Sequence, residues 1–407
     1  MTTEERKAED ARFRQEYPLF AQYPELIYLD NAATTQKPSC VIQAESAFYE
    51  KYNANPFRGV YELAEFATEH YEEARAAVAE LLHANTDEIV FTRNASESLN
   101  LIAYSLGNLV LRPGDEVLVS IMEHHSNLLV WQQAAKRTGA TLRYLDCTQD
   151  GKITAEMVES AITDKTKIFA VTQISNVLGW KNDIKSFAEI CHRKGCLIVA
   201  DGAQSVPHIE VDVKALDVDF LAFSGHKVYG PTGIGILYGK YDLLADMPPY
   251  QYGGDMIEHV SYEKTFFTNP PARFEAGTPA IVQAIGLGAS LNYLMQFDFN
   301  EIEEYENNLT DYATKQMSEI SGLKILGAAK EKGGVFSFAI DGIHPQDLAF
   351  ILGKEGIAIR TGHFCAEPLV NYLGYTSLAR ASLGIYTIKE DIDEFIKALY
   401  KAKDFFS

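Results

Sequence analysis

Short apolar segments alternate with amphipathic segments through the middle of the chain. The apolar segments predict buried strands at Ile89–Thr92, Glu116–Ser120, Thr141–Leu145, Lys167–Thr172, Leu197–Asp201, Phe220–Phe223 and Gly235–Tyr238. Most of them are separated by segments with helical spacing, at Glu97–Leu109, Asn127–Arg137, Ala155–Ala161 and Asp183–Lys194. Strands that alternate with helices in this way predict a mostly parallel seven-stranded sheet, covered by helices on both faces.

The flanking segments predict further elements and a second domain. Before the alternation we expect an amphipathic arm over 1–24, a strand at Ile27–Asp30, and helices at Cys40–Tyr52 and Leu63–His83. After Thr278 we expect helices at Ala280–Phe297, Ile302–Glu319, Gln346–Leu352 and Lys389–Asp404, and short strands at Gly334–Ile340, Gly356–Arg360 and Leu378–Leu383. The predicted fold is α/β, with a large domain over 25–291 and a smaller α+β domain formed by 1–24 and 292–407.

Composition and charge narrow the function. The chain has 407 residues and a formal net charge of −20, so it has no general attraction for nucleic acid or anionic lipid. The charged N-terminal segment lacks the apolar core of a signal peptide, and no stretch approaches the ~18 apolar residues of a membrane span. The five cysteines are scattered and form no C-x-x-C pair, which is typical of a reducing compartment. We therefore expect a cytoplasmic protein.

Cys191, His192 and Cys196 suggest a metal site at first sight. They lie where a helical pattern runs into a strand, and there cysteine commonly serves as a small buried hydrophobe. We therefore predict no metal.

Polar residues gather where five consecutive predicted strands end. The segments are Thr92–Glu97, Met122–Asn127, Gln173–Gly179, Asp201–Ser205 and Ser224–Lys227. Solvated loops would explain one or two of them. Ligands of open parallel sheets bind beyond the carboxyl ends of the strands, so five polar ends together predict one shared site.

Lys227 is the central residue of this predicted site. It closes the motif Ser224-Gly-His-Lys, directly after an apolar strand and before a glycine-rich turn. A lysine that loses its hydration has a lowered pKa and becomes a usable nucleophile or base. The alternative is an ordinary solvated lysine in a surface turn.

The strand ends carry the groups that pyridoxal 5′-phosphate (PLP) requires. This cofactor needs a lysine for an imine, an acidic partner for its ring nitrogen, and phosphate donors. A predicted helix start supplies amides and small side chains for the phosphate. The candidates are Lys227 for the imine, Asp201 for the ring nitrogen, His124 for stacking on the ring, Ala95, Ser96, Ser224 and His226 for the phosphate, and Gln204 and Asn176 for the phenolic oxygen.

Several motifs taken together resemble a known family. They are SGHK followed by GPTGIGILYG, ADGAQS, EHHSN, NASESLNLIA, RFEAGTP and RTGHFCAEPL. As a set they resemble the class V branch of fold-type I PLP enzymes, and more narrowly the group II cysteine desulfurases of the SufS type. The resemblance runs from about Tyr28 to about Ile385. It implies a fold-type I PLP-transferase architecture and a homodimer.

The resemblance also implies roles for individual residues. Lys227 would anchor the cofactor and shuttle a proton, and His124 would be a possible acid–base group. Thr278 would complete the phosphate site from the other subunit. Arg360, Arg380 and Asn31 would bind the substrate, with the two arginines holding its carboxylate. Without the resemblance, two arginines this far apart in the sequence are separate surface charges.

Cys365 decides which class V enzyme the resemblance implies. The cysteine lies in a loop beside a glycine and a histidine and near the arginines, and nearby cations lower a thiol pKa. A buried, inert cysteine is the alternative. The resemblance implies that Cys365 takes the sulfur of L-cysteine as a persulfide, leaves L-alanine, and supplies iron–sulfur cluster assembly. Its acceptor would be a protein of the SufE or SufU type, docking beside Arg58 and Thr361.

Three positions depart from the family pattern: Phe57 and Phe364 stand where histidines are usual, and Gln346 stands where members with a zinc-containing partner tend to have histidine. Two other functions remain open. A selenocysteine lyase or another class V enzyme would keep Lys227 and Asp201 without needing Cys365. A non-catalytic assembly protein would need none of the three.

Overall fold

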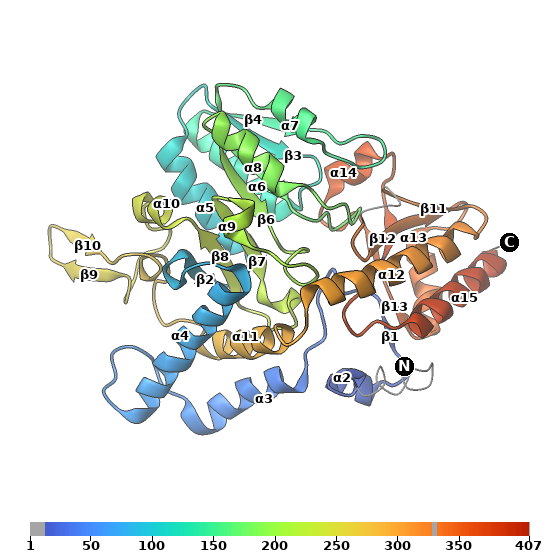
Figure 1. The fold of residues 1–407 in the computed structure, drawn as a ribbon, viewed down its shortest axis with the longest axis horizontal. Coiled ribbons are helices and arrows are strands. Elements are labelled where there is room, and N and C mark those ends of the chain that lie inside the picture. The colour runs from blue at the N-terminus through green and yellow to red at the C-terminus, as the bar shows by residue number, and fades with distance from the viewer. Residues whose placement is uncertain (1–12, 328–331, 407) are drawn as a thin grey trace.

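The computed structural model describes residues 13–327 and 332–406. Its central feature is a seven-stranded sheet with the strand order β2-β8-β7-β6-β5-β3-β4 (Figure 1). Strand β8 runs antiparallel to both of its neighbours, and the other neighbouring pairs are parallel. The strands are β2 (Ile89–Thr92), β3 (Glu116–Ser120), β4 (Thr141–Leu145), β5 (Thr166–Thr172), β6 (Leu197–Asp201), β7 (Phe220–Ser224) and β8 (Gly235–Gly239). The mostly parallel seven-stranded sheet predicted from the sequence is confirmed.

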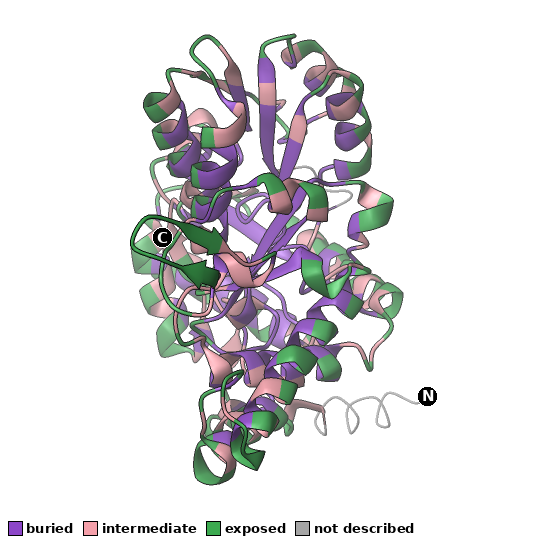
Figure 2. Cartoon of the chain, turned by 90° about the vertical axis from the view of Figure 1, so that its left-hand side faces the viewer, coloured by how far each residue is buried: buried purple, intermediate pink, exposed green. Residues whose placement is uncertain are grey.

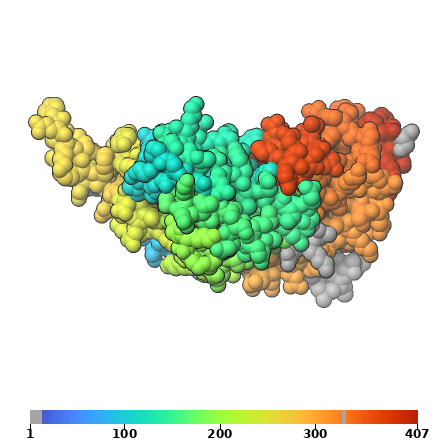
Figure 3. All heavy atoms as spheres, turned by 90° about the horizontal axis from the view of Figure 1, so that it is seen from above, coloured from blue at the N-terminus to red at the C-terminus, as the bar shows by residue number. Residues whose placement is uncertain are grey.

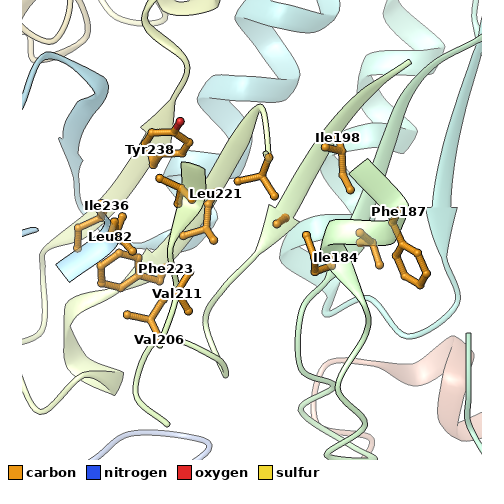
Figure 4. Close-up of a cluster of buried hydrophobic side chains, with 14 of the residues drawn as sticks. Leu82, Ile184, Phe187, Ile198, Val206, Val211, Leu221, Phe223, Ile236 and Tyr238 are labelled. Carbon is orange, nitrogen blue, oxygen red and sulfur yellow. The ribbon is translucent and has the colours of Figure 1, made fainter. Parts of the chain in front are cut away.

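Helices cover both faces of this sheet, because alternate residues of each strand point to opposite sides. Leu221 and Phe223 of β7 face the side where Phe187 packs, whereas Phe220 and Ala222 belong to the core on the other side (Figure 4). The helices of this part are α3 (Ser39–Ala47), α4 (Glu62–Leu82), α5 (Ala95–Val110), α6 (His125–Thr138), α7 (Ala155–Ala161), α8 (Ile184–Arg193), α9 (Val213–Leu216), α10 (Tyr241–Asp246) and α11 (Ile281–Leu294). The sheet is buried between these layers (Figure 2).

The C-terminal part forms a second, smaller layer of sheet and helices. Its antiparallel sheet has the order β11-β12-β15-β14, and its core includes Phe336, Phe338 and Leu399. The strands are β11 (Leu323–Ile325), β12 (Val335–Ile340), β13 (Ile357–Ala358), β14 (Arg360–Gly362) and β15 (Leu378–Ser382), and the helices are α12 (Phe299–Ser318), α13 (Pro345–Lys354), α14 (Glu367–Tyr372) and α15 (Lys389–Phe406). Strand β1 (Ile27–Tyr28) pairs with β13 in this part, although it lies inside the predicted large domain. The domain limits of 25–291, 1–24 and 292–407 stay a prediction.

The predicted amphipathic arm over 1–24 can be compared with the structure only from Phe13 onward, because residues 1–12 lie outside the described residues. Phe13 and Arg14 are helical, a turn follows, and Pro18–Gln22 forms helix α2. Arg14 pairs with Asp391 at 2.8 Å on the C-terminal side, whereas Glu16 accepts a hydrogen bond from the hydroxyl of Tyr293 on α11. The arm therefore packs on both parts and not only on the smaller one. Aromatic side chains fix it there, because Tyr17 lies buried against Tyr386.

A hairpin of β9 (Ile257–Val260) and β10 (Thr265–Phe267) stands off the body and was not predicted (Figure 3). Both strands are short and exposed, so they lack the buried apolar run by which the other strands were recognised. None of the helices in the described residues is long and apolar enough to cross a membrane.

Candidate active site

A cavity of about 540 Å³ opens at the carboxyl ends of β5, β6 and β7 and is closed on its other side by β14 and β15. It brings together residues from segments that are far apart in the sequence. Twelve of the predicted site residues line it: Ala95, Ser96, His124, Asn176, Asp201, Gln204, Ser224, His226, Lys227, Arg360, Cys365 and Arg380.

Lys227 reaches the cavity from a short helical turn, Gly225–Lys227, that directly follows the buried strand β7. The turn can be this tight because Gly225 has no side chain: a Cβ there would lie 2.6 Å from Ile234. Burial lowers the pKa of the Lys227 amine to about 8, Asp201 opposes the shift, and Arg380 adds to it. About a tenth of the amine is therefore neutral at pH 7, far more than for an ordinary lysine with a pKa near 10.4.

We expect the Lys227 amine of the cofactor-free protein to react with a small amine reagent such as acetic anhydride with a midpoint near pH 8. The reaction needs the neutral amine, and an ordinary lysine reaches its midpoint near pH 10.4. Asp201→Asn should move the midpoint lower, because the carboxylate favours the ammonium form. Peptide mapping by mass spectrometry at a series of pH values measures this, and a midpoint above pH 10 would contradict it.

Asp201 and Glu123 are two buried carboxyl groups at neighbouring strand ends. Asp201 accepts a hydrogen bond from the amide of Ala203 at 2.9 Å, and burial raises its pKa. Glu123 lies behind the cavity floor, where it contacts the hydroxyl of Ser120, the amide of Asn127 at 2.6 Å and the backbone N–H of Thr172 at 2.8 Å. Burial raises the Glu123 pKa to about 8, and the negative charge of Asp201 adds to this effect. At neutral pH Glu123 is therefore mostly protonated.

Glu123→Gln is expected to leave the folded state largely intact, because a neutral amide occupies the place of a neutral acid. Glu123→Ala should cost about 1–3 kcal/mol for each buried donor left unpaired. The Glu123 pKa is raised on folding, so its contribution to stability is complete below about pH 4.3 and is lost as pH rises through 8. Denaturant unfolding between pH 5 and 8 should show this slope, at most about 1.4 kcal/mol per pH unit, in the wild type but not in Glu123→Gln.

His124 is held as a neutral imidazole over the cavity. The backbone N–H of Ser126 donates to its Nδ1 at 3.1 Å, which places the ring proton on Nε2. Burial, together with the charge of Lys227, lowers the His124 pKa to about 4. The imidazole of His124 is therefore neutral and held in one orientation by the bond to Nδ1, which suits it to stacking on an aromatic cofactor ring.

The start of α5 and the end of β7 form a cradle of hydroxyl groups and amides. The N–H of Ala95 donates to Ser224 Oγ at 2.9 Å, and the hydroxyls of Ser96 and Ser126 lie 2.6 Å apart. Asn94 caps the helix by accepting a hydrogen bond from the N–H of Glu97. Donors at a helix start attract anions, so this end of the cavity fits a phosphate group.

The two predicted arginines are direct neighbours across strands. The register of β14 and β15 pairs Arg360 with Arg380, and Asp30 faces both guanidinium groups at 2.9 Å and 3.5 Å. Arg380 is buried, and burial lowers its pKa to about 10. Its Nε has no hydrogen-bond partner among the described residues. A buried cation with a free donor fits an anionic ligand such as a carboxylate.

Cys365 lies in a short loop between β14 and α14, exposed at the cavity mouth. Phe364 and Cys365 both have left-handed backbones, with φ of 52° and 55°. Two hydrogen bonds fix these conformations: the amide of Asn176 donates to the Phe364 carbonyl at 2.8 Å, and the N–H of His125 donates to the Cys365 carbonyl at 2.6 Å. The guanidinium of Arg380 lies 4.7 Å from the centre of the Phe364 ring. The loop is therefore anchored to the cavity wall.

Two predicted residues do not line the cavity. Asn31 is buried, and its amide donates to the carbonyls of Tyr28 and Ser382 while its oxygen accepts from Tyr386. With these bonds made, its side chain is committed to the fold, so its substrate role stays a prediction. Thr278 lines a second cavity, of about 380 Å³, with Glu275 and Tyr250.

The amides predicted for a phenolic oxygen also have structural partners. The side-chain amide of Gln204 donates to the Ala32 carbonyl at 2.8 Å, and the side-chain amide of Asn176 donates to the Phe364 carbonyl. Sequence reasoning missed Asn94, Ser126, Thr172 and His363 as lining residues and Asp30 as a partner of the arginines. Ser126 and Thr172 stood inside or beside motifs already singled out, so their position at strand ends was a usable signal. Nothing local marked Asp30 as a partner of residues this distant.

Cys191 and Cys196 are buried, and His192 faces Asp217 and Asp219 at 3.0 Å each. No group of three or more His, Cys, Asp or Glu suited to a metal occurs within residues 13–327 and 332–406.

Comparison with known proteins places the chain in a family. Residues 27–395 match the aminotransferase class-V family, and the chain belongs to it. The chain is 48% identical over 382 residues to a probable cysteine desulfurase of Halalkalibacterium halodurans, with 94% of each protein covered. It is 46% identical over 384 residues to one of Staphylococcus aureus, with 94% of the chain and 93% of the relative covered.

Solved structures give the same result. The cysteine desulfurase CsdA from Escherichia coli superposes with a TM-score of 0.92 at 37% identity, covering 98% of this chain and 99% of that one. A cysteine desulfurase from Thermococcus onnurineus also gives a TM-score of 0.92, at 40% identity, covering 95% and 96%. The chain is an enzyme of the PLP-dependent class. The cavity fits that cofactor. One end carries hydrogen-bond donors for a phosphate group, and the other end carries Lys227, whose amine pKa is lowered, and the buried carboxyl group of Asp201.

Proposed function

We propose that this chain is a cysteine desulfurase that converts L-cysteine to L-alanine and holds the sulfur as a persulfide on Cys365. One observation carries the proposal: Lys227, the two arginines and Cys365 share a single cavity. Cys365 is close enough to Lys227 and Arg380 to influence the pKa of both. The thiol therefore lies within reach of the amine that would hold the cofactor and of the guanidinium groups that would hold the substrate.

The cofactor end of the cavity assigns roles to the chain's own residues. When bound, PLP supplies an imine linkage and an electron sink at the substrate α-carbon. Lys227 would hold the cofactor and accept the α-proton on its amine, whose pKa of about 8 suits a base near neutral pH. Asp201 would keep the ring nitrogen protonated, and His124 would stack on the ring. Ala95, Ser96, Ser224 and His226 would bind the phosphate.

The substrate end of the cavity is built for a carboxylate. Arg380 offers its free Nε, and Arg360 is half-exposed above it. A bound carboxylate would take over part of the charge pairing that Asp30 now supplies. Planar forks of this kind fix orientation as well as affinity, so they would aim the substrate sulfur at the cysteine loop.

The sulfur step joins the substrate sulfur to Cys365, and the bound cofactor would supply the electron sink that lets the C–S bond break. The Cys365 thiolate attacks the substrate sulfur, so an S–S bond forms while the C–S bond breaks. The electron pair of the broken bond remains with the carbon skeleton, which takes up protons and leaves as L-alanine. The sulfur stays on the enzyme as a persulfide, one atom heavier than the thiol.

The persulfide would be collected by a protein of the SufE or SufU type for iron–sulfur cluster assembly in the cytoplasm. Because the loop is fixed at the Phe364 and Cys365 carbonyls, it cannot carry the sulfur far. The acceptor thiol must therefore approach the mouth, on the side of Thr361. Arg58, which the sequence also predicted for this side, pairs with Asp255 at 2.8 Å and does not line the cavity, so its role stays a prediction. We further propose a homodimer in which the partner's Thr278 completes the phosphate site.

Mass spectrometry of the holoenzyme after brief exposure to L-cysteine tests the function. The expected result is the mass of one added sulfur atom on the peptide with Cys365, removed by dithiothreitol, together with stoichiometric L-alanine. Peptides with Cys40, the other exposed cysteine, serve as the internal control. L-alanine formation without added sulfur on Cys365 would refute the persulfide role.

A further inference from the structure

The peptide that joins His226 to Lys227 is held by an unusual number of donors. Its carbonyl oxygen, that of His226, accepts from Lys37 Nζ at 2.8 Å and from the Thr34 and Thr35 hydroxyls at 3.1 Å each. The backbone N–H of Thr35 adds a fourth contact at 3.2 Å. A carbonyl oxygen has two lone pairs, so this oxygen is more than satisfied. A peptide is planar, and fixing its oxygen also fixes the N–H and the Cα direction of Lys227.

Lys37 is the ionisable member of this group. Its Nζ also donates to the Thr35 carbonyl at 2.6 Å, and the carboxylate of Glu45 acts on it at longer range. Burial lowers the Lys37 pKa to about 7. Placing an amine against two carbonyls costs more desolvation than an apolar side chain of equal length would. Stability alone does not account for a lysine here, whereas a requirement at the His226–Lys227 peptide does.

The donor loop is itself firmly attached on the substrate side of the cavity. The N–H of Ala32 donates to Ser382 Oγ at 2.8 Å, and the N–H of Gln36 donates to the Tyr386 hydroxyl at 2.9 Å. Ser382 ends β15, the strand that carries Arg380. Loop 31–37 therefore fixes the base of Lys227 relative to the strand that carries the substrate arginine.

We propose that Lys37 is a positioning residue for Lys227: its Nζ donates to the His226 carbonyl, holds the His226–Lys227 peptide and so aims the Lys227 amine. The inference rests on the proposed function, because it assumes that Lys227 carries the cofactor and moves the proton. Lys37 itself does not line the cavity, so it would act on the cofactor and the substrate only through Lys227.

The test compares Lys37→Met with Lys37→Arg and Lys332→Met as purified holoenzymes. Lys332 is a matched control: it is buried, it donates to the Leu326 carbonyl at 3.1 Å, and it lies outside the cavity lining. Two readouts are measured, the pH midpoint of the visible absorption of bound PLP, and kcat and KM for L-cysteine. A purely structural role would lower the thermal stability of both methionine variants and move neither readout.

We expect Lys37→Met to shift the absorption midpoint by at least half a pH unit. It should also lower kcat about 10- to 100-fold, while KM changes less than threefold, because misplacement of about 1 Å costs rate more than binding. Lys37→Arg keeps a cation and hydrogen-bond donors, so its absorption midpoint and its kcat should lie close to the wild-type values. Lys332→Met should keep the wild-type values of both. Wild-type values in Lys37→Met would overturn the inference, as would an equal change in Lys332→Met.

Lys37→Gln replaces Lys37→Met if the latter does not fold, since it keeps one amide donor but no charge. An intermediate change in both readouts would support the inference, and wild-type values would overturn it. Loss of visible PLP absorption in the wild type would instead overturn the proposed function and this inference with it.

Discussion

Lys227→Ala is expected to reduce L-alanine formation to background and to remove the PLP linked to the chain. The variant loses the group that holds the cofactor and the base that moves the α-proton. General acid–base catalysis alone contributes about 10²- to 10⁴-fold. Loss of the cofactor attachment adds to this, so we expect kcat/KM to fall by at least about 10³-fold. Alanine formation by the variant and by the wild type, each with saturating PLP, measures the loss.

A matched control is Lys181→Ala, which removes a half-buried lysine that pairs with Glu303 outside the cavity lining. It should keep wild-type activity. Methylamine should restore part of the Lys227→Ala activity, because a free amine can enter the space left beside Asp201. Activity within tenfold of the wild type without added amine would show that Lys227 is not the base.

The sheet and most of the cavity floor could be predicted because apolar strands and the polar residues at their ends are local features of the sequence. Strand β7 has an apolar run that stops at Ser224, and its predicted and observed ends differ by one residue. Parallel strands in a covered sheet are apolar throughout, so their ends stand out as the first polar positions. Asp201 and Lys227 were found in this way, without knowledge of their neighbours.

The substrate side was not predictable from local pattern. Arg360 and Arg380 meet only through the register of β14 and β15, and Asp30 joins them from a loop that is 330 residues away from Arg360. Register depends on tertiary packing, which a single sequence does not display. The resemblance to a family, and not the spacing, is what placed the two arginines together.

The backbone conformation of the Cys365 loop also could not be predicted from the sequence. Phe364 and Cys365 adopt left-handed backbones, which non-glycine residues rarely do. Nothing in RTGHFCAEPL specifies that conformation, and the hydrogen bonds that hold it come from Asn176 and His125. The structure also shows what the change from the usual histidine to Phe364 does. The apolar ring of Phe364 lies against the guanidinium of Arg380, where a histidine would place a polar ring edge.

Cys365→Ala is expected to abolish sulfur transfer while PLP stays bound. The cavity keeps its lysine, its carboxylate and its phosphate cradle, so the visible spectrum should be that of the wild type. Sulfide release with L-cysteine and dithiothreitol should fall by at least about 10³-fold, as for other enzymes that lose their nucleophile.

Cys40→Ala is the matched control, because Cys40 is also exposed but lies on α3, outside the cavity lining. Partial desolvation raises the Cys40 pKa although the residue is exposed, so this thiol is a poor nucleophile and its loss should leave the activity unchanged. The comparison also separates the candidate activities. A class V enzyme that cleaves its substrate without a cysteine nucleophile would keep its turnover in Cys365→Ala, and that result would leave the PLP site intact but exclude the persulfide route. Loss of turnover in Cys365→Ala alone ties the chemistry to the one thiol that faces both Lys227 and the arginines.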